Sequence, residues 1–256
     1  MVGGQDRKNV VSAMRRDLSN KTALITGSAR RLGRHLALSL AEAGCDIVVH
    51  HHQHTEDAAT LVQEIENLGR RAWSLKADFL EAGAVERLAD EAIEQAGQLD
   101  ILVNNVGNYL SKPVLETTPD EWRDILEANV IAPHALIRKF VAQCPDTGGH
   151  ILNIGYAGVE NLRPHPTATA YQISKSGLLI MTKTYAETLA KDGIRVNMIS
   201  PGHLDNSVDL PVNISAEIPI GRAGRLSDIE DALHYLLDFD GYVTGVNLDV
   251  AGGYRL

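Results

Sequence analysis

Cysteine is scarce in this chain, basic residues are fewer than acidic ones, and no long apolar run is present. Only Cys45 and Cys144 are cysteines, so we expect two free thiols in a reducing cytoplasm rather than a disulfide framework. No apolar run is long enough to cross a bilayer or to form a secretory signal, so we expect no membrane association. The net charge of −9 argues against a nucleic-acid-binding surface.

The composition and length are those of an ordinary globular protein. Hydrophobic residues make up 44% of the 256 residues and charged residues 22%. No Pro/Gly/Ser-rich linker and no fixed repeat divides the chain. We therefore expect a flexible N-terminal extension over residues 1–19 and a single domain over residues 20–256.

Short strand-like runs alternate with longer helical patterns. The strand-like runs are Thr22–Thr26, Asp46–His50, Ala72–Lys76, Ile101–Asn104, Ile151–Ile154, Arg195–Ile199 and Val246–Val250. The helical segments between them include Gly33–Ala43, Thr55–Leu68, Ala84–Gln95, Glu121–Gln143 and Tyr171–Lys191. Continuous apolar runs are typical of strands buried on both faces. The alternation predicts an α/β fold with one doubly wound, Rossmann-like domain, whose seven-stranded, mainly parallel sheet carries helices on both faces.

A glycine turn follows the first predicted strand. It runs from Gly27 to Gly33 and leads directly into a predicted helix. Glycine permits a tight turn and close approach of the backbone to a pyrophosphate, and the helix amino end offers free N–H groups and a favourable dipole. The turn therefore predicts a dinucleotide site at the carboxyl end of this strand.

The second strand ends in a histidine-rich segment, His50 to His54, where a carboxylate that holds ribose hydroxyls would be expected for NAD. The first acid after it is Glu56, which falls on the next helix, whereas Arg30 and Arg31 lie in the glycine turn. A missing acid together with added arginine favours a 2′-phosphate, and hence NADP over NAD. His50 and His52 could add hydrogen bonds, or the run could be a solvated loop. A metal site is not expected, because no cysteine or carboxylate pattern supports one.

Tyr171 and Lys175 lie four residues apart at the start of a predicted helix, and therefore on one helix face. A lysine ammonium near a phenol lowers the pKa of the phenol, which can then act as a general acid toward a carbonyl oxygen. The spacing alone is common, so the interpretation depends on the other motifs of the chain.

These motifs together resemble the classical short-chain dehydrogenase/reductase family, from Asn20 to Leu256. The glycine turn, Asp78 with Phe79, the segment Asn104–Gly107, Asn129, the Tyr171 and Lys175 pair, and the segments Arg195–Gly202 and Gly245–Gly253 match family motifs in order and spacing. The resemblance implies reduction of a carbonyl or imine carbon with NADPH. In the mechanism that the resemblance implies, Tyr171 donates the proton, Lys175 lowers the pKa of Tyr171 and binds the nicotinamide ribose, and Asn129 holds a water of the proton relay. The residues it places at the cofactor are Gly27, Ser28, Arg30, Arg31, Leu32, Gly33, His50, His52, Asp78, Phe79, Asn105, Val106, Gly107, Tyr171, Lys175, Pro201 and Gly202.

The sequence departs from the family pattern at two positions. Arg31 stands where the family has the middle glycine of the turn. An arginine at this position resembles pteridine reductases; alternatively, Arg31 only caps a surface turn. The catalytic serine after the fifth strand is replaced by Tyr156. A tyrosine hydroxyl could donate the same hydrogen bond to the substrate oxygen, or Tyr156 could be only a wall of the pocket. Ser174, Thr167 and His165 are weaker substitutes.

The substrate is less well determined than the cofactor. The predicted lid between Pro201 and Pro219 is short, which argues against a steroid-sized ligand and leaves a pterin, a small ketone or a 3-oxoacyl thioester. A non-catalytic NADPH sensor is a further alternative, because the family serine is missing. The family further implies a homotetramer or homodimer, with Glu121–Gln143 and Tyr171–Lys191 as the expected contact helices.

Overall fold

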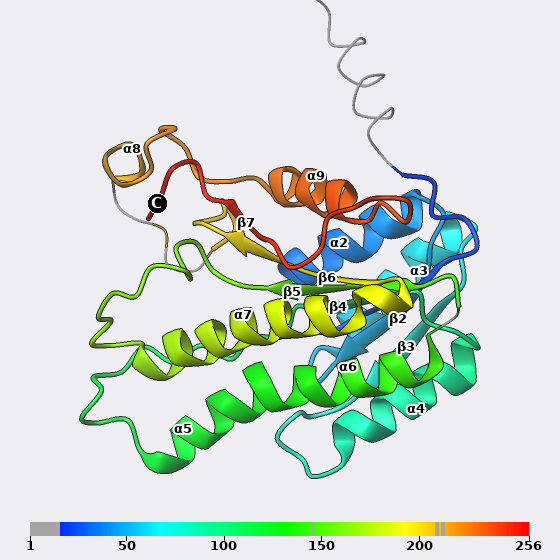
Figure 1. Ribbon diagram of the computed structural model, residues 1–256, viewed down its shortest axis with the longest axis horizontal. Coiled ribbons are helices and arrows are strands. Elements are labelled where there is room, and N and C mark those ends of the chain that lie inside the picture. The colour runs from blue at the N-terminus through cyan, green and yellow to red at the C-terminus, as the bar shows by residue number, and fades with distance from the viewer. Residues whose placement is uncertain (1–15, 145, 208–209, 211–212, 256) are drawn as a thin grey trace, which may run out of the picture.

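Seven strands of apolar and β-branched residues form one parallel sheet in the computed structural model, which describes residues 16–144, 146–207, 210 and 213–255. The strands are β1 (Thr22–Ile25), β2 (Asp46–His51), β3 (Ala72–Lys76), β4 (Ile101–Asn104), β5 (Gly149–Ile154), β6 (Ile194–Pro201) and β7 (Asn247–Val250). Their order is β3-β2-β1-β4-β5-β6-β7, and every described pairing is parallel (Figure 1). The predicted doubly wound α/β fold is confirmed. The strand order reverses between β1 and β4, the place where such sheets bind ligands.

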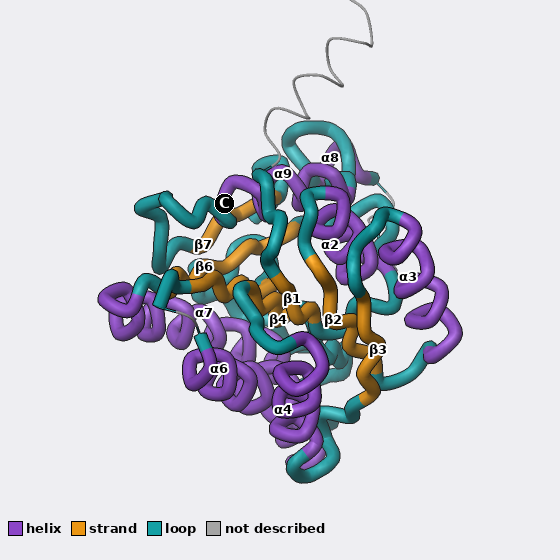
Figure 2. Tube along the Cα trace, turned by 90° about the vertical axis from the view of Figure 1, so that its right-hand side faces the viewer, coloured by secondary structure: helices purple, strands orange, loops and turns teal. Residues whose placement is uncertain are grey.

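The helices cover both faces of the sheet (Figure 2). The α-helices in the described part of the chain are α2 (Arg31–Glu42), α3 (Thr55–Asn67), α4 (Ala84–Ala96), α5 (Pro119–Leu126), α6 (Ala132–Gln143), α7 (Thr169–Leu189), α8 (Ile214–Glu217) and α9 (Leu226–Leu236), of which α2, α3 and α9 cover one face and α4, α6 and α7 the other. Alternate residues of each central strand face opposite sides, so Ile25 packs in the core with α2, α3 and α9. Leu24, its neighbour, packs in the core with α4, α6 and α7. None of the helices in the described ranges is long and apolar enough to cross a membrane.

The segment expected as one helix, Glu121–Gln143, is divided in the structure. A capping box on Thr118 and Glu121 starts α5, and a π-helical turn (Glu127–Ile131) joins α5 to α6. Such turns insert one extra residue into a helix and are frequent at functional sites. The described chain also packs before the expected boundary at residue 20, because Leu18 is buried in the core. Most of the expected extension lies outside the described residues.

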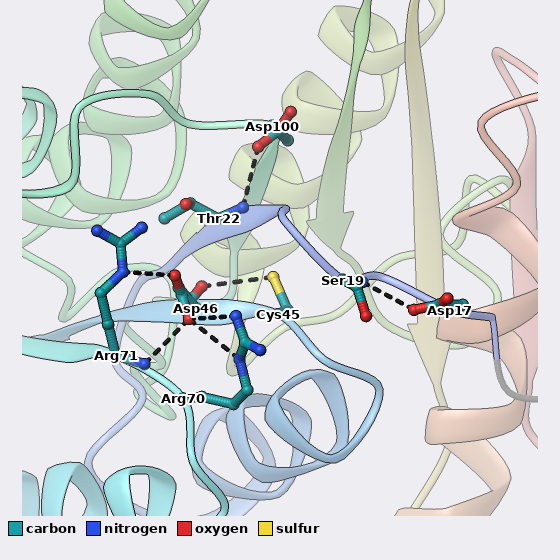
Figure 3. Close-up of polar contacts among 8 residues, drawn as sticks. All are labelled: Asp17, Ser19, Thr22, Cys45, Asp46, Arg70, Arg71 and Asp100. Carbon is teal, nitrogen blue, oxygen red and sulfur yellow. Dashed lines mark hydrogen bonds and ion pairs between the residues drawn. The ribbon is translucent and has the colours of Figure 1, made fainter.

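The amino edge of the sheet is held by buried carboxylates (Figure 3). Asp46, the first residue of β2, accepts hydrogen bonds from the side chains of Arg70 and Arg71, at 2.8 and 2.7 Å. Asp100 accepts the backbone N–H of Thr22 at 2.9 Å. These contacts join β1, β2, β3 and β4 at the edge opposite the carboxyl ends, so these acids stabilise the fold and lie away from the ligand edge.

Candidate active site

The glycine turn brings β1 and α2 into direct contact. A Cβ atom on Gly33 would lie 2.4 Å from the carbonyl oxygen of Gly27, so only glycine fits there. Gly27 itself has a φ of 62°, in the left-handed region. Arg30 precedes α2 in an extended conformation, and its side chain does not cap the first N–H groups of the helix. Those donors are free for an anionic ligand, so the turn fits a pyrophosphate.

Thr26 and Asn105 join this turn to the loop after β4. The Thr26 hydroxyl accepts the backbone N–H groups of Asn105 and Val106, at 2.9 and 3.0 Å. The Asn105 amide donates to the carbonyl oxygens of Thr26 and Gly27, at 2.9 and 3.2 Å. The two loops that flank the strand-order reversal therefore form one unit. The sequence placed Asn105 and Val106 at the cofactor, and the structure places them directly beside the glycine turn.

His50 lies in a different environment from the one expected. The sequence suggested that its ring could bind the cofactor, but the side chain is buried, and both ring nitrogens already have partners in the protein. Its Nδ1 accepts the Gly27 N–H at 3.0 Å, and its Nε2 lies 3.1 Å from the carbonyl oxygen of Ala77. The ring stacks on Phe79 at 4.7 Å. Burial lowers the pKa of His50 to about 4, so this histidine is a neutral support for the turn.

A cavity of about 420 Å³ opens beside this support, beyond the ends of β1, β2 and β3. Arg30, His52, His54 and Asp78 are among its lining residues. Arg30 forms an ion pair with Asp57 at 3.1 Å, and His52 lies 3.4 Å from Asp78. No group of three or more metal-ligating side chains occurs among the described residues. The exposed Arg30 guanidinium at this cavity suits a phosphate, and Arg30 and His52 face the two carboxylates.

Arg31 does not line this cavity. It lines a second cavity of about 630 Å³, together with Leu32, Tyr171, Pro201 and Gly202. Its φ of 50° is left-handed, which explains why the family pattern has glycine here. The expected role of Arg31 at the cofactor stays a prediction, and the structure places this residue in the cavity of the predicted catalytic pair as well. The alternative that Arg31 only caps a surface turn stays open.

Tyr171 and Lys175 meet in this second cavity. Both lie in the first turns of α7, and the Lys175 Nζ lies 5.9 Å from the centre of the Tyr171 ring. The buried ammonium donates to the carbonyl oxygen of Ile154 at 2.7 Å, and burial lowers the pKa of Lys175 to about 8. A Cβ on Gly107 would lie 3.0 Å from the same Nζ, so the loop after β4 closes over the lysine.

The pKa of Tyr171 changes in the direction opposite to the one the sequence suggested. Burial raises it well above the usual value, and the phenols of Tyr156 and Tyr109 add to the effect. The Lys175 ammonium, 5.9 Å from the centre of the Tyr171 ring, donates to the Ile154 carbonyl, and burial of the phenol is the largest effect on the Tyr171 pKa. Tyr171 therefore holds its proton throughout the neutral range, as a proton donor requires.

Asn129 lies in the π-helical turn and is buried. Its amide exchanges two hydrogen bonds with the backbone of Asn108, at 2.8 and 2.9 Å, and donates to the Ser174 hydroxyl at 3.0 Å. Ser174 in turn donates to the carbonyl oxygen of Tyr171 at 2.7 Å. Asn129 thus connects the loop after β4 to the helix turn that carries Tyr171. Ser174 is occupied inside this network, so it does not replace the missing serine at the cavity.

Tyr156 follows β5 and lies beside the predicted proton donor. The ring centres of Tyr156 and Tyr171 are 5.7 Å apart, and both residues line the second cavity. Burial raises the pKa of Tyr156, an effect that the nearby Arg255 and Gln172 oppose. The residue that occupies the position of the family serine therefore keeps its hydroxyl proton.

Sequence reasoning missed several residues of this cavity. Tyr109 packs edge-on against Tyr171 at 4.9 Å, and His203 packs against Tyr254 at 4.8 Å. Arg255 also lines the cavity, and its guanidinium lies 5.1 Å from the Tyr254 ring. Tyr109 could have been found from its place two residues after the Asn-Asn-Val-Gly segment. Tyr254 and Arg255 follow the last glycines, and no pattern in the sequence marks them.

Comparison with known proteins assigns the same family. Residues 27–255 match the family model described as enoyl-(acyl carrier protein) reductase. A 3-oxoacyl-[acyl-carrier-protein] reductase of Staphylococcus epidermidis is 31% identical over 242 residues, which are 91% of this chain and 98% of that protein.

Two solved structures are similar throughout. A blue fluorescent protein from a metagenomic library, in complex with NADPH, is 35% identical with a TM-score of 0.88, and the match covers 94% of this chain and all of that one. The landomycin C-6 ketoreductase with bound NADP and rabelomycin is 30% identical with a TM-score of 0.84, covering 94% and 98%. With its parallel sheet, its glycine turn and its Tyr171 and Lys175 pair, this chain belongs to the short-chain dehydrogenase/reductase family.

Proposed function

We propose that the protein is an NADPH-dependent reductase of a carbonyl substrate, with Tyr171 as the proton donor. The observation that carries the proposal is the pairing of a protonated Tyr171 with the buried Lys175 ammonium, at a cavity beside the glycine turn. The NADPH and NADP in the similar structures and the carbonyl-reducing relatives support it. Hydride acceptance by the carbonyl carbon places negative charge on its oxygen, and the Tyr171 phenol neutralises that charge by giving up its proton.

The residues present fit an NADP molecule, which when bound supplies the hydride. Gly27, Ser28 and Gly33 form the cradle for the pyrophosphate, and Asn105 holds that cradle in place. Arg30 and His52 are the proposed donors to the 2′-phosphate. Asp78, Phe79 and Val106 border the cavity in which the adenine would lie. The nicotinamide would lie in the cavity of Tyr171, which Leu32, Pro201 and Gly202 line, with Gly107 beside Lys175.

Lys175 and Asn129 act on Tyr171 from two sides. With a pKa of about 8, the Lys175 ammonium remains charged at neutral pH, and its charge stabilises the Tyr171 phenolate after the proton has left. Asn129 positions the Asn108 backbone and, through Ser174, the first turn of α7. We further propose a reducing cytoplasmic setting, which the two unbridged cysteines support.

The direct test is NADPH oxidation with two substrates assayed side by side, acetoacetyl thioester and dihydrobiopterin. The acyl-carrier-protein reductases among the relatives favour the thioester, whereas arginine at position 31 favours the pterin. Turnover of either substrate, lost in Tyr171→Phe, supports the reductase. Tight NADPH binding with no turnover on a broad carbonyl panel would instead support the non-catalytic sensor.

Arg30→Ala and His52→Ala are each expected to lower the preference for NADPH over NADH by about 10-fold. A charge-assisted hydrogen bond contributes roughly 1.5–3 kcal/mol, and loss of Arg30 also frees Asp57 from its ion pair. The measurement is the ratio of kcat/KM for the two coenzymes. Arg87→Ala, an exposed arginine that is paired with Glu81 on another part of the surface, is the matched control. Ratios that stay within twofold of the original would remove both residues from the phosphate site.

Tyr156→Phe is expected to lower kcat/KM by at least ~10-fold, or about 1.4 kcal/mol of transition-state stabilisation. The ring would still fill its place beside Tyr171, so the loss isolates the hydroxyl that we propose holds the substrate oxygen. Tyr242→Phe removes a fully exposed hydroxyl and is the control. An unchanged rate would make Tyr156 a wall of the cavity.

We also propose that the chain assembles as a homodimer or homotetramer through α7. Ile173 and Ile180 are exposed on one face of this helix, and Gly177 between them allows close approach of a second helix. We expect light scattering after size exclusion to give a multiple of 27.8 kDa, and Ile180→Glu to lower the mass. A monomer in the unmutated protein would contradict the proposal.

A further inference from the structure

The cavity in front of Tyr171 is lined by flat rings. Tyr109, Tyr156 and Tyr171 form one group with ring centres 4.9 and 5.7 Å apart, and the His203 and Tyr254 pair forms another. The chain has few aromatic residues, at 5% of the total, so this concentration at one cavity is a specific feature. Aromatic walls favour a flat, conjugated ligand, because stacked and edge-on ring contacts add to the burial of apolar area.

The charged residues of the same cavity all have one sign. Arg31 and Arg255 line it, and no aspartate or glutamate is among its described lining residues. Neither arginine forms an ion pair with a carboxylate in the described part of the chain, whereas Arg30 pairs with Asp57 and Arg222 with Asp228. Guanidinium groups that project into a cavity without an acid in its wall suit an anionic group of a ligand.

Both arginines also have left-handed backbones. Their φ values are 50° for Arg31 and 58° for Arg255, and only Asn20 and His54 share this conformation among the described non-glycine residues. A left-handed residue with a Cβ atom is destabilised by roughly 1 kcal/mol, which glycine avoids. Two such positions that keep arginine on the same cavity indicate that the side chains serve a function which outweighs the strain.

Building on the proposed reductase function, we infer that the substrate is a flat, aromatic or conjugated carbonyl compound that bears a carboxylate or similar anionic group, recognised by Arg31 and Arg255. The rings hold the flat part of the molecule beside Tyr171, and the arginines orient it through its negative charge. An uncharged or wholly aliphatic carbonyl compound lacks one of these two recognition elements.

The test compares two aldehydes that share one ring and one reacting group, 4-carboxybenzaldehyde and its neutral methyl ester. Succinic semialdehyde, which is anionic but aliphatic, tests the requirement for a ring. We expect kcat/KM with NADPH to be at least ~10-fold higher for the carboxylate than for the ester or the semialdehyde, and the advantage to shrink with added salt.

Arg31→Gly and Arg255→Gly should each lower the ratio of kcat/KM for acid over ester by ~10-fold, without a fall in Tm, because glycine relieves the left-handed strain. Comparison of one ratio between proteins cancels the different intrinsic reactivities of the two aldehydes. Arg255→Lys, which keeps the charge, should recover part of the ratio. Asn20→Gly relieves the same kind of strain away from both cavities and is the matched control.

Equal turnover of acid and ester, with ratios unchanged in the glycine variants, would overturn the inference and leave the reductase standing. If no aldehyde is turned over, calorimetry with 4-(hydroxymethyl)benzoate and its methyl ester on the NADP-loaded protein decides. Binding of the acid alone, lost in Arg31→Gly, would support recognition of an anionic aromatic ligand, and the broad carbonyl panel then decides whether the protein is a reductase. Equal or absent binding of both would refute the inference as well.

Discussion

Tyr171→Phe is expected to lower kcat/KM by about 100-fold or more. Burial raises the pKa of Tyr171, and the phenol therefore holds a proton at every pH at which the enzyme would work. General acid catalysis contributes typically 10²–10⁴-fold, and phenylalanine keeps the ring contacts with Tyr109 and Tyr156 while it removes the proton. The measurement is NADPH oxidation at saturating coenzyme.

The coenzyme affinity separates the chemical role of Tyr171 from a structural one. The Kd for NADPH of Tyr171→Phe should stay within a few-fold of the original value, because the glycine turn is held by Thr26, Asn105 and His50. Lys183→Ala, which removes an exposed side chain of the same helix, is the control for general damage to α7. A variant that retains more than a tenth of the activity would exclude Tyr171 as the general acid.

Lys175→Met is expected to abolish turnover and at the same time to stabilise the fold. The pKa of Lys175 falls from 10.5 to about 8 because the ammonium is buried, and this shift corresponds to about 3 kcal/mol of destabilisation at neutral pH. Methionine fills a similar volume without charge, although the Ile154 carbonyl loses its donor at a cost of about 1 kcal/mol. The net gain of about 2 kcal/mol should raise Tm by roughly 4–8 °C.

The pH dependence identifies the origin of this gain. Between pH 8 and 10.5 the unfolded chain binds the Lys175 proton and the folded chain releases it, so the free energy of unfolding rises with pH in this window. Below pH 8 both states are protonated and the burial penalty is complete. Urea unfolding at pH 7.5 and 10 should therefore show the two proteins converging at the higher pH. A variant that is less stable at pH 7.5 would contradict this account.

The sequence predicted the architecture well because its signal is local. Continuous apolar runs, glycine turns and strand–helix alternation predicted all seven strands and the parallel sheet, whereas the strand order and its reversal between β1 and β4 come from the structure. The helix Leu226–Leu236 was not among the segments named, although Leu226, Ile229, Leu233 and Leu236 have helical spacing. The π-helical turn at Asn129 could not be predicted, because it depends on the fit of that side chain to Asn108 and Ser174.

The sequence predicted which residues belong to the candidate site better than it predicted the contacts that their side chains make. The motifs identified Tyr171 and Lys175. The direction in which the Lys175 ammonium points, however, depends on the Ile154 carbonyl at the end of strand β5. Arg31 and His50 likewise have neighbours that the sequence did not indicate. Arg31 lines the cavity with Tyr171, and His50 is enclosed by Ala77 and Phe79 from the segment after β3. Such exchanges depend on tertiary packing, which one sequence does not contain.

The buried His50 limits which backbone donors the glycine turn can offer. A neutral imidazole that accepts the Gly27 N–H at Nδ1 must carry its single proton on Nε2. The Nε2–H then donates a hydrogen bond to the Ala77 carbonyl oxygen, so the ring is fixed in one tautomer. The Gly27 N–H is thereby consumed by the protein itself. Any phosphate must be bound by donors further along the chain, toward the first turn of α2. His50 therefore sets where along the loop an anion can settle, although its ring nitrogens need never touch one.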